Sequence, residues 1–580
     1  MNERVRQVHG HHGADGIRVA DLTSSPVGNT VRSEVRADPP SVVPIILLPG
    51  IMGSNLKAHT QVVLDGRVIA RAEAPVWRVD SPVGVGLKWL GRSAAARRSL
   101  LNKDVLEVDP GGKIKAGANT ARGDRDAHVA DRRRRGWGTV SWAYYGPLLN
   151  WLEESLGNLE LTLKQEAAAG GNDGNDPLPG LPNQALQDVI DALVDKPIDG
   201  ARVQPDPIRL GQVAGLLDHA FPVHAFGYNW TESNIESGAR LAEYIEALVK
   251  EYNDPGREPA SVCKGVILLT HSMGGLVARA AAKEHGAEQH ILGVIHGVMP
   301  THGAGAFYKR MVAGFSNEHT GFFDIMGRIT AYALGRSARE TLPVLALNPG
   351  PLELAPNHRY NGGRPWLMIR SHDGTLLKSL PEVEPGKDAD PYGQIYSRTD
   401  VWWRAVNPEW LDPVGLELDP EGKYLNVLQQ AKRYHSKLAD RGGFHSRTFA
   451  HYGDDPSHAT WGEVAWEVTP SRRNLWGVGW RGHEVGSTRE GMPESWEVHK
   501  HNGTDHAVLR DPDGAEITVA ILKGADPGDG TVPAAASAAA VDQFSEISCR
   551  HEQGFDHNSD YLDPRVRSWV LNVIVRTLGE

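Results

Sequence analysis

The run LLTHSMGGLV at 268–277 constrains the fold more than any other part of the sequence. An apolar, strand-like segment leads directly into Ser272, which is flanked by small residues, and a helix pattern follows. Such a strand, turn and helix exposes the serine hydroxyl at the strand end, and the turn needs small residues two positions before and after the serine. We therefore predict that Ser272 is a nucleophile. The alternative is a chance junction of strand and helix, since Thr270 stands where the simplest motif has glycine.

A serine hydroxyl is a weak nucleophile at neutral pH, so it needs a base and an acid that orients the base. Asp529 lies in the turn GDGTVP (528–533), where the glycines let its carboxylate turn toward the carboxyl edge of a sheet. His557 lies between the last predicted strand and the last predicted helix, and we expect it to take the serine proton and return it to the leaving group. Two alternatives stay open: Asp529 belongs to an ordinary turn, or His551 is the base, although it has less reach directly after its strand.

The predicted reaction also needs two backbone donors for an oxyanion. The first is the N–H of Met273, at the start of the helix that follows the serine. The second is the N–H of Ile51, in the glycine-rich apolar loop PGIMGS (49–54) after an early strand. Taken alone, this loop is a simple strand-ending turn. The motifs nevertheless occur in the order oxyanion loop, serine, aspartate and histidine, which random placement would seldom produce.

Apolar, strand-like runs alternate with helix patterns over much of the chain. This alternation predicts an α/β fold with a mostly parallel sheet covered by helices on both faces. The rhythm is lost from about 306 to 510, where nine of the sixteen tryptophans lie, so we expect an insertion with its own core. The predicted strands are 42–48, 223–226, 265–269, 291–295, 517–522 and 544–549, and the predicted helices are 147–156, 234–252, 273–282 and a last one opened by Asp563 and Pro564.

Composition excludes several other classes of protein. A formal net charge of −11 with 40% apolar residues argues against a polybasic nucleic-acid binder and against a disordered chain. The two cysteines provide no disulfide framework and no motif has zinc-site spacing, so we predict neither a metal nor a cofactor. The N-terminus has no apolar signal segment, and we expect a cytoplasmic product without a membrane span. The run DRRRR (131–135) is expected to be a solvated loop, with a phosphate or lipid-headgroup patch as the alternative.

At these motifs the chain resembles the α/β-hydrolase superfamily, and more closely its lecithin:cholesterol acyltransferase-like and bacterial lipase branch. The resemblance implies that the early loop supplies an oxyanion donor, the serine is acylated and the aspartate orients the histidine; it carries these roles to Ile51, Ser272, Asp529 and His557. Asn229 departs from the aspartate usual in its motif, which leaves that segment without an assigned role. The motifs are ILLPGIMGSNL (46–56), AFGYNW (225–230), THSMGGLVARA (270–280), HGVMPTHGAG (296–305) and GDGTVP (528–533).

The resemblance also implies a large cap between the strand after the serine helix and the strand that carries the acid. We therefore expect a mobile N-terminal tail (1–40), a first part of the α/β-hydrolase core (41–305), a cap or lid insertion (306–510) and a second part of the core (511–580). An apolar, aromatic cap suits a substrate with acyl chains, since burying one methylene is worth about 0.8 kcal/mol.

The leading functional hypothesis is a serine lipase or phospholipase that hydrolyses acyl esters of lipids through an acyl-enzyme on Ser272. Its partners would be a lipid or acyl-ester substrate and, transiently, a membrane surface, but no nucleic acid. An acyltransferase would use the same three residues, and a non-catalytic binding module is the third hypothesis. A general resemblance to injected bacterial toxins extends the first hypothesis to an antibacterial lipase effector, exported by a dedicated secretion system and bound by an immunity protein.

Overall fold

A computed structural model describes residues 41–579 of the chain with several gaps. The gaps are residues 81–88, 90, 118–123, 158, 160, 164–179, 257–260, 316, 317, 319–332, 440, 471–495, 512, 513 and 542–547. Backbone alone is described at 10–12, 18–22, 33–37, 161–163, 180, 181, 441, 470, 540 and 541.

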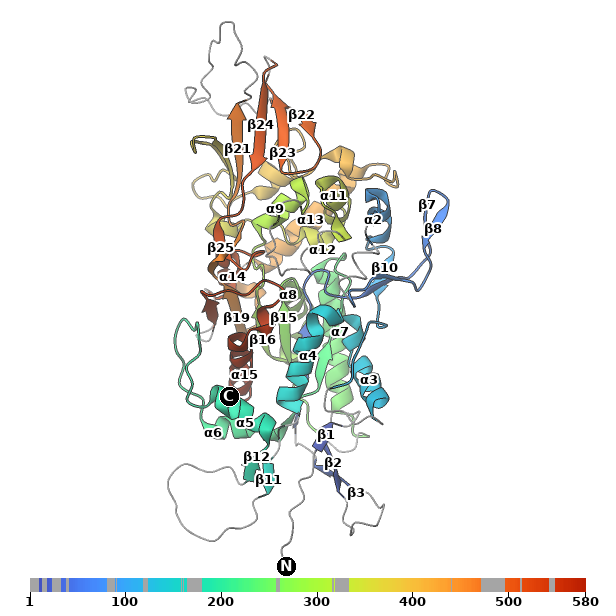
Figure 1. Ribbon diagram of the computed structural model, residues 1–580, viewed down its shortest axis with the longest axis vertical. Helices are drawn as coiled ribbons and strands as arrows, with labels where there is room; N and C mark the ends of the chain where they lie inside the picture. Colours follow the sequence, from blue (N-terminus) through green and yellow to red (C-terminus); the bar gives the residue numbers. More distant parts are fainter. Residues whose placement is uncertain are drawn as a thin grey trace, which may run out of the picture.

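A six-stranded sheet forms the centre of the molecule, with the strand order β14–β5–β15–β16–β19–β26 (Figure 1). Every neighbouring pair is parallel, which confirms the predicted α/β class with a mostly parallel sheet. The strand order reverses between β5 and β15, and ligands of such sheets bind outside the carboxyl ends of the strands at this reversal. The strands are β5 (Ile45–Leu48), β14 (Val223–Ala225), β15 (Val266–His271), β16 (Ile291–Gly297), β19 (Thr448–Gly453) and β26 (Cys549–His551).

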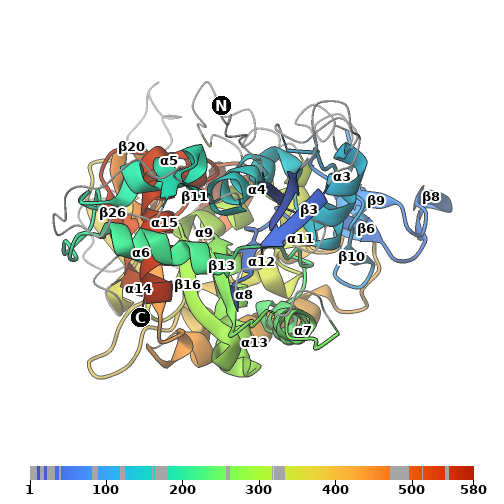
Figure 2. The same cartoon turned by 90° about the horizontal axis from the view of Figure 1, so that it is seen from below.

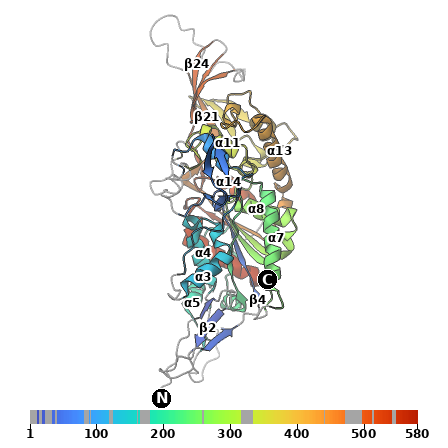
Figure 3. The same ribbon diagram turned by 90° about the vertical axis from the view of Figure 1, so that its right-hand side faces the viewer.

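Helices cover both faces of this sheet because successive strand residues point to opposite sides. On β5, Ile46 and Leu48 pack in one hydrophobic cluster with residues of α7 and α8, whereas Ile45 and Leu47 pack in another with residues of α4, α5 and α15. Figures 2 and 3 show α7 on one side and α4 and α5 on the other. The helices are α4 (Trp142–Gly157), α5 (Gln184–Leu193), α6 (Leu210–Ala214), α7 (Asn234–Tyr252), α8 (Gly274–Glu284) and α15 (Pro564–Gly579).

The ends of these helices follow the residues that cap them. Ser233 caps α7 by accepting a hydrogen bond from the N–H of Ile235, and α15 begins at Pro564 as the sequence predicts. Helix α4 is the exception, because it begins at Trp142 and carries Pro147 inside it rather than at its start. A proline inside a helix removes one hydrogen bond. The apolar side chains of α4 at Leu148, Leu149 and Leu152 are buried against the sheet, which accounts for its persistence.

A second six-stranded sheet lies at the far end of the molecule, with α9, α11 and α13 between it and the parallel sheet (Figures 1 and 3). Its order is β18–β17–β21–β24–β23–β22, and only β17 and β21 pair in parallel. A separate hydrophobic cluster beneath it contains Trp366, Trp403 and Trp466, each buried. The elements are β17 (Leu367–Ser371), β18 (Leu376–Leu380), β21 (Val464–Pro470), β22 (Glu497–His501), β23 (His506–Arg510), β24 (Glu516–Ile521), α9 (Gly305–Ala313), α11 (Ala338–Leu345), α12 (Pro349–Leu352) and α13 (Pro420–Leu438).

Two strands belong to a different sheet from the one that the expected domain boundaries at residues 305 and 510 imply. Strand β19 lies inside the expected insertion but pairs in the parallel sheet, while β24 lies in the expected core but pairs in the second sheet. Burial explains both assignments. All six residues of β19 are buried, as in a strand covered on both faces, whereas burial alternates along β24, as in an antiparallel strand covered on one face.

Smaller sheets surround the centre. The N-terminal segment, expected to be a tail, contains a three-stranded antiparallel sheet in which the alternating runs RVADL and SEVRA pair. Its other residues lie outside the described part of the chain. These strands are β1 (Gly10–His12), β2 (Arg18–Leu22) and β3 (Ser33–Ala37); the others are β4 (Ser41–Val42) with β13 (His219–Ala220), β6 (Leu56–Ala58) with β9 (Pro75–Trp77) and β10 (Leu106–Val108), β7 (Val62–Leu64) with β8 (Arg67–Ala70), and β11 (Leu161–Leu163) with β12 (Gly180–Pro182).

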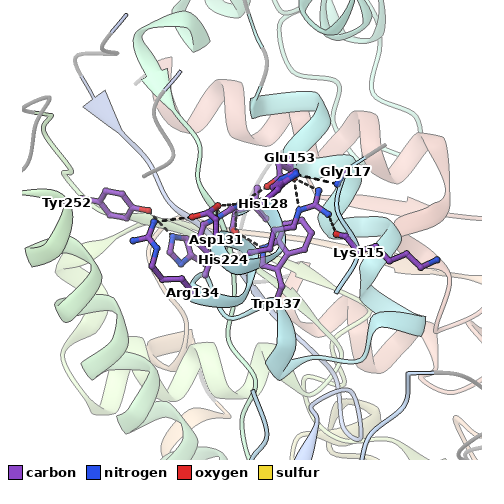
Figure 4. A network of polar contacts seen from close by, with 12 residues as sticks. Lys115, Gly117, His128, Asp131, Arg134, Trp137, Glu153, His224 and Tyr252 are labelled. Atoms are coloured by element: carbon purple, nitrogen blue, oxygen red, sulfur yellow. Dashed lines mark hydrogen bonds and ion pairs between the residues drawn. The ribbon is translucent and has the colours of Figure 1, made fainter. Parts of the chain in front are cut away.

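The arginine run 131–135 is not the solvated loop that the sequence suggests. It ends helix α3 (Arg125–Arg134), and both Arg132 and Arg135 are buried against Glu153 of α4, next to Trp137 (Figure 4). Burial alone would raise the pKa of Glu153, but His128 and the two arginines lower it. These two guanidinium groups therefore hold α3 on α4. Because they form ion pairs inside the protein, they are not available as the phosphate or lipid-headgroup patch that was the alternative for this run.

No helix among the described residues is long and apolar enough to cross a membrane. Cys263 and Cys549 are both buried.

Candidate functional site

Ser272 lies in the tight turn between β15 and α8, at the reversal of strand order. Its φ is 52°, which is left-handed and strained for a residue other than glycine, and its N–H donates to the carbonyl of Gly297 at 2.9 Å. Small residues are required after it, since a Cβ at Gly274 would lie 2.6 Å from the carbonyl oxygens of Leu48 and Pro49. The sequence therefore folds into a strained turn that presents the serine hydroxyl at the strand end.

Thr270 occupies the position where the simplest motif has glycine, and it is fully buried. Its Oγ1 lies 2.9 Å from Nδ1 of His296 on the neighbouring strand β16. A buried hydroxyl is tolerated when it has such a partner. The extra atoms of Thr270 are thus accommodated by a cross-strand hydrogen bond.

The structure brings Ser272, His557 and Asp529 into one line of hydrogen bonds. Nε2 of His557 lies 3.0 Å from Oγ of Ser272, and Nδ1 lies 2.8 Å from Oδ2 of Asp529. The other carboxylate oxygen, Oδ1, accepts the N–H groups of Thr531 at 2.9 Å and Val532 at 2.7 Å. All three aligned side chains are at least nine-tenths buried. The hydrogen bond to Asp529 keeps the proton of His557 on Nδ1, so that its Nε2 lone pair faces the serine hydroxyl.

Asp529 reaches the site by an indirect route. The chain leaves the parallel sheet at Gly453, contributes β21 to β24 to the second sheet, and returns through β25 (Asp526–Gly528). Strand β25 pairs antiparallel with β20 (Asp455–Thr460), which directly follows β19. A Cβ at Gly453 would lie 3.3 Å from that of Asp529. The carboxylate therefore lies at the carboxyl end of β19, although 76 residues separate it from Gly453.

The competing histidine, His551, is the last residue of β26 and is buried. Its ring packs against His451 and Phe555, with ring centroids 6.0 and 5.5 Å apart. Neither ring nitrogen has a hydrogen-bond partner among the described residues. The structure therefore brings His557, and not His551, to the serine.

The loop after β5 lies directly beside the serine. A Cβ at Gly50 would lie 3.0 Å from that of Ser272, and Gly53 closes the loop by donating to the carbonyl of Gly50 at 3.0 Å. Ile51 follows Gly50 at the tip of this loop, and Met273 precedes the first residue of α8. The loop after β5 and the N-terminal end of α8 therefore both adjoin Ser272.

Several residues that support the site were not found by motif reasoning. Tyr228 donates to the carbonyl of Pro49 at 2.8 Å and holds the loop after β5 in place. Asn229, which departs from the usual aspartate, donates to the carbonyl of Leu106 at 3.0 Å and accepts from Thr231. Its role is therefore in the backbone packing around the loop. The motif AFGYNW (225–230) contains both residues, but it did not indicate these contacts.

Within the part of the chain that the structure describes, no three histidine, cysteine, aspartate or glutamate side chains gather as metal ligands would. The hydrogen bonds from Asp529 through His557 to Ser272 are an arrangement in which a carboxylate, an imidazole and a serine can act together on a substrate carbonyl.

No family model and no curated protein matches the chain. Among solved structures, the chain is similar to one in the crystal structure of the Tle4–Tli4 complex, with 27% sequence identity and a TM-score of 0.69 over 93% of this chain and 98% of that one. The mature form of the Bacillus licheniformis lipase BlEst2 also matches, at 17% identity and a TM-score of 0.15 over 26% of this chain and 54% of that one. The first match extends over both sheets of the molecule, whereas the second overlaps too poorly to support an argument.

Proposed function

We propose that the protein is a serine esterase of the α/β-hydrolase fold that cleaves acyl esters of lipids. The observation that carries this proposal is the line of hydrogen bonds from Asp529 through His557 to Ser272 at the carboxyl end of a parallel sheet. A buried serine hydroxyl beside an imidazole that a carboxylate orients is the arrangement that nucleophilic acyl transfer requires. The motifs at 46–56, 270–280 and 528–533 support the lecithin:cholesterol acyltransferase-like and lipase branch.

In the first half of the proposed reaction, Oγ of Ser272 attacks the ester carbonyl while Nε2 of His557 takes its proton. The N–H groups of Ile51 and Met273 stabilise the negative charge on the carbonyl oxygen. Collapse of the tetrahedral intermediate breaks the ester bond, and His557 gives its proton to the departing alcohol. In the second half, His557 takes a proton from water while the water oxygen attacks the acyl carbonyl. Collapse of the second tetrahedral intermediate breaks the bond to Oγ of Ser272, His557 returns its proton to Oγ, and the fatty acid is released.

The apolar composition of the second sheet and its helices supports the proposal that the substrate is apolar. They form a separate hydrophobic cluster beyond the carboxyl end of the parallel sheet, and residues from both pieces of chain flanking β19 contribute to it. We infer that this part acts as a cap over the acyl chains. Burying several methylenes at about 0.8 kcal/mol each would hold a lipid against the site.

We further infer that the protein is an effector with a dedicated protein inhibitor. The similar chain belongs to the crystal structure of the Tle4–Tli4 complex, and the likeness covers 93% of this chain and 98% of that one. An immunity protein that covers the site would spare the producing cell. Titration of the enzyme with the product of a neighbouring gene tests this extension, since a cognate inhibitor should abolish fatty-acid release at equimolar concentration and an unrelated protein should not.

The central proposal is tested by replacing the nucleophile. We expect the wild type to release fatty acid from phospholipid or diacylglycerol vesicles and to be labelled on Ser272 by a fluorophosphonate probe. The Ser272→Ala variant should lose both properties while keeping its circular dichroism spectrum and thermal midpoint. Ser436→Ala, which changes an exposed serine on α13, is the matched control and should retain both.

Fatty-acid release by a folded Ser272→Ala variant would refute the proposal. Adding an acceptor alcohol at low water content distinguishes hydrolysis from transfer, because both use the same acyl-enzyme. A new ester as the main product would favour an acyltransferase.

A further inference from the structure

A second line of buried hydrogen bonds connects the two loops that flank Ser272. It starts at the N–H of Gly50, in the loop after β5, which donates to the hydroxyl of Tyr145 at 2.8 Å. That hydroxyl lies 2.9 Å from Nδ1 of His271, and Nε2 of His271 lies 2.7 Å from the backbone carbonyl of His557. Tyr145 comes from α4 and His271 from the end of β15, so neither residue belongs to the two loops that the line joins.

The direction of each hydrogen bond in this line is fixed by chemistry. The carbonyl of His557 can only accept, so Nε2 of His271 must carry a proton and donate it. Burial lowers the pKa of His271, so its ring is neutral and Nδ1 is an acceptor. Tyr145 must therefore donate to Nδ1, and burial raises the pKa of this phenol, which keeps its proton in place. The phenol oxygen is then free to accept the N–H of Gly50, and the line has one consistent set of protons.

The surroundings of His271 hold its ring in this orientation. The ring packs edge-on against Tyr145, with centroids 5.7 Å apart, and lies 5.1 Å from the ring of His557. The buried carboxylate of Asp560 lies 3.7 Å from Nε2 of His271, which is the ring nitrogen that carries the proton. A Cβ at Gly50 would approach Nδ1 to 2.8 Å, so the loop after β5 lies directly on the ring.

We propose that Tyr145 and His271 are positioning residues, which keep the oxyanion loop and the loop of the catalytic histidine in register on either side of Ser272. This inference rests on the proposed serine esterase function and adds to it two residues that touch neither the substrate nor the nucleophile's proton. The loop amide of Ile51 directly follows Gly50, and the imidazole of His557 is attached to the backbone whose carbonyl ends the line. A displacement of either loop by 1 Å would cost about 100-fold in rate.

The test removes single atoms from the line. Tyr145→Phe deletes the hydroxyl but keeps the ring that packs on His271, and we expect it to slow phosphonylation of Ser272 by a fluorophosphonate about 10- to 100-fold. In ester hydrolysis the loss should fall on kcat, with KM within twofold. His271→Ala should cause a loss at least as large, whereas His271→Gln should restore part of it, because an amide can accept from Tyr145 and donate to the carbonyl of His557.

Tyr424→Phe is the matched control, since Tyr424 is also buried and donates one hydrogen bond to a backbone carbonyl, that of Tyr396, within the hydrophobic cluster of the second sheet. It should lose similar stability and keep the wild-type rate. Hydrogen exchange provides a second measurement without activity: the peptide covering 49–56 should exchange faster in Tyr145→Phe than in Tyr424→Phe.

The outcomes separate the two proposals. Wild-type protein that fails to label on Ser272 would refute the serine esterase itself. Normal wild-type labelling together with a Tyr145→Phe rate within twofold and unchanged exchange at 49–56 would overturn the positioning role alone.

Discussion

Replacing Asp529 by asparagine should reverse the tautomer of His557 while leaving the shape of the site intact. In the wild type, Oδ1 accepts two backbone N–H groups, from Thr531 and Val532, and Oδ2 accepts Nδ1–H of His557. An asparagine keeps one oxygen, and the two backbone donors will hold it. The amide NH2 group then faces Nδ1 of His557, which must become an acceptor, so its proton moves to Nε2 and points at Ser272.

The alternative orientation of the asparagine is unfavourable. It would face its NH2 group toward the two backbone donors and lose both hydrogen bonds, at about 1 to 3 kcal/mol for each unsatisfied buried group. With the proton on Nε2, His557 cannot take the proton of Ser272. The same change of tautomer in a serine protease lowers kcat by about 10⁴-fold. Here a fall of about 10⁴-fold corresponds to about 5.4 kcal/mol of lost transition-state stabilisation.

The assay is steady-state hydrolysis of a short p-nitrophenyl ester by Asp529→Asn, with KM expected to stay within twofold because the carboxylate does not contact the substrate. Asp526→Asn, three residues earlier, is the matched control. Both hydrogen bonds of Asp526, from the N–H groups of Gly462 and Glu463, end on a single oxygen, which the amide retains. A folded Asp529→Asn variant that loses less than tenfold in kcat would refute the tautomer argument.

Two further predictions concern stability. Glu153→Gln leaves the buried Arg132 without its counter-charge and removes one of the two carboxylates that pair with the buried Arg135. It should lower the free energy of unfolding in urea by about 3 to 5 kcal/mol, whereas Glu251→Gln, at an exposed pair with Arg134, should cost less than about 1 kcal/mol; equal losses would contradict this. Burial raises the pKa of Glu353 to about 8 against the hydrogen bonds from Ser233 and Asn234, so the folded state keeps a proton that the unfolded state releases above its ordinary pKa near 4.5. Wild-type stability should therefore fall from about pH 5 to about pH 8 by up to about 1.4 kcal/mol per pH unit. The Glu353→Gln variant should show a flatter decline. An unchanged slope in this variant would show that the carboxyl of Glu353 is ionised throughout this pH range.

The parallel sheet was accessible from sequence because both of its faces are covered. Strands such as β5 and β15 are continuous apolar runs, and a cap residue marks the start of α7. The pairing of β24 was not accessible, because its apolar residues suit either sheet and its partners lie far away in the chain. The arginine run shows the same limit: local charge predicts exposure, whereas Glu153, which buries Arg132 and Arg135, lies on another helix.

For the candidate site, sequence indicated which residue types meet but not what holds them. Ser272 and Asp529 each belong to a recognisable local motif, and His557 follows them between the last predicted strand and the last predicted helix, so their order was informative. Tyr145 belongs to no motif, and although His271 precedes Ser272 in THSMGGLVARA (270–280), that motif assigned it no role. Their importance depends on distances of 2.7 to 2.9 Å between elements far apart in the chain, which no motif encodes.

The chain returns to Asp529 through β25 after it has passed through the second sheet, so the proposed site depends on the chain that forms this sheet. Excising the second sheet to obtain a minimal hydrolase would cut the only covalent path that delivers the carboxylate to the end of β19. During synthesis, likewise, the nucleophile emerges from the ribosome 257 residues before the acid, and the base follows later still. Under the proposed mechanism, a chain that ends before Asp529 carries the proposed nucleophile without its acid and base, and it should release no fatty acid.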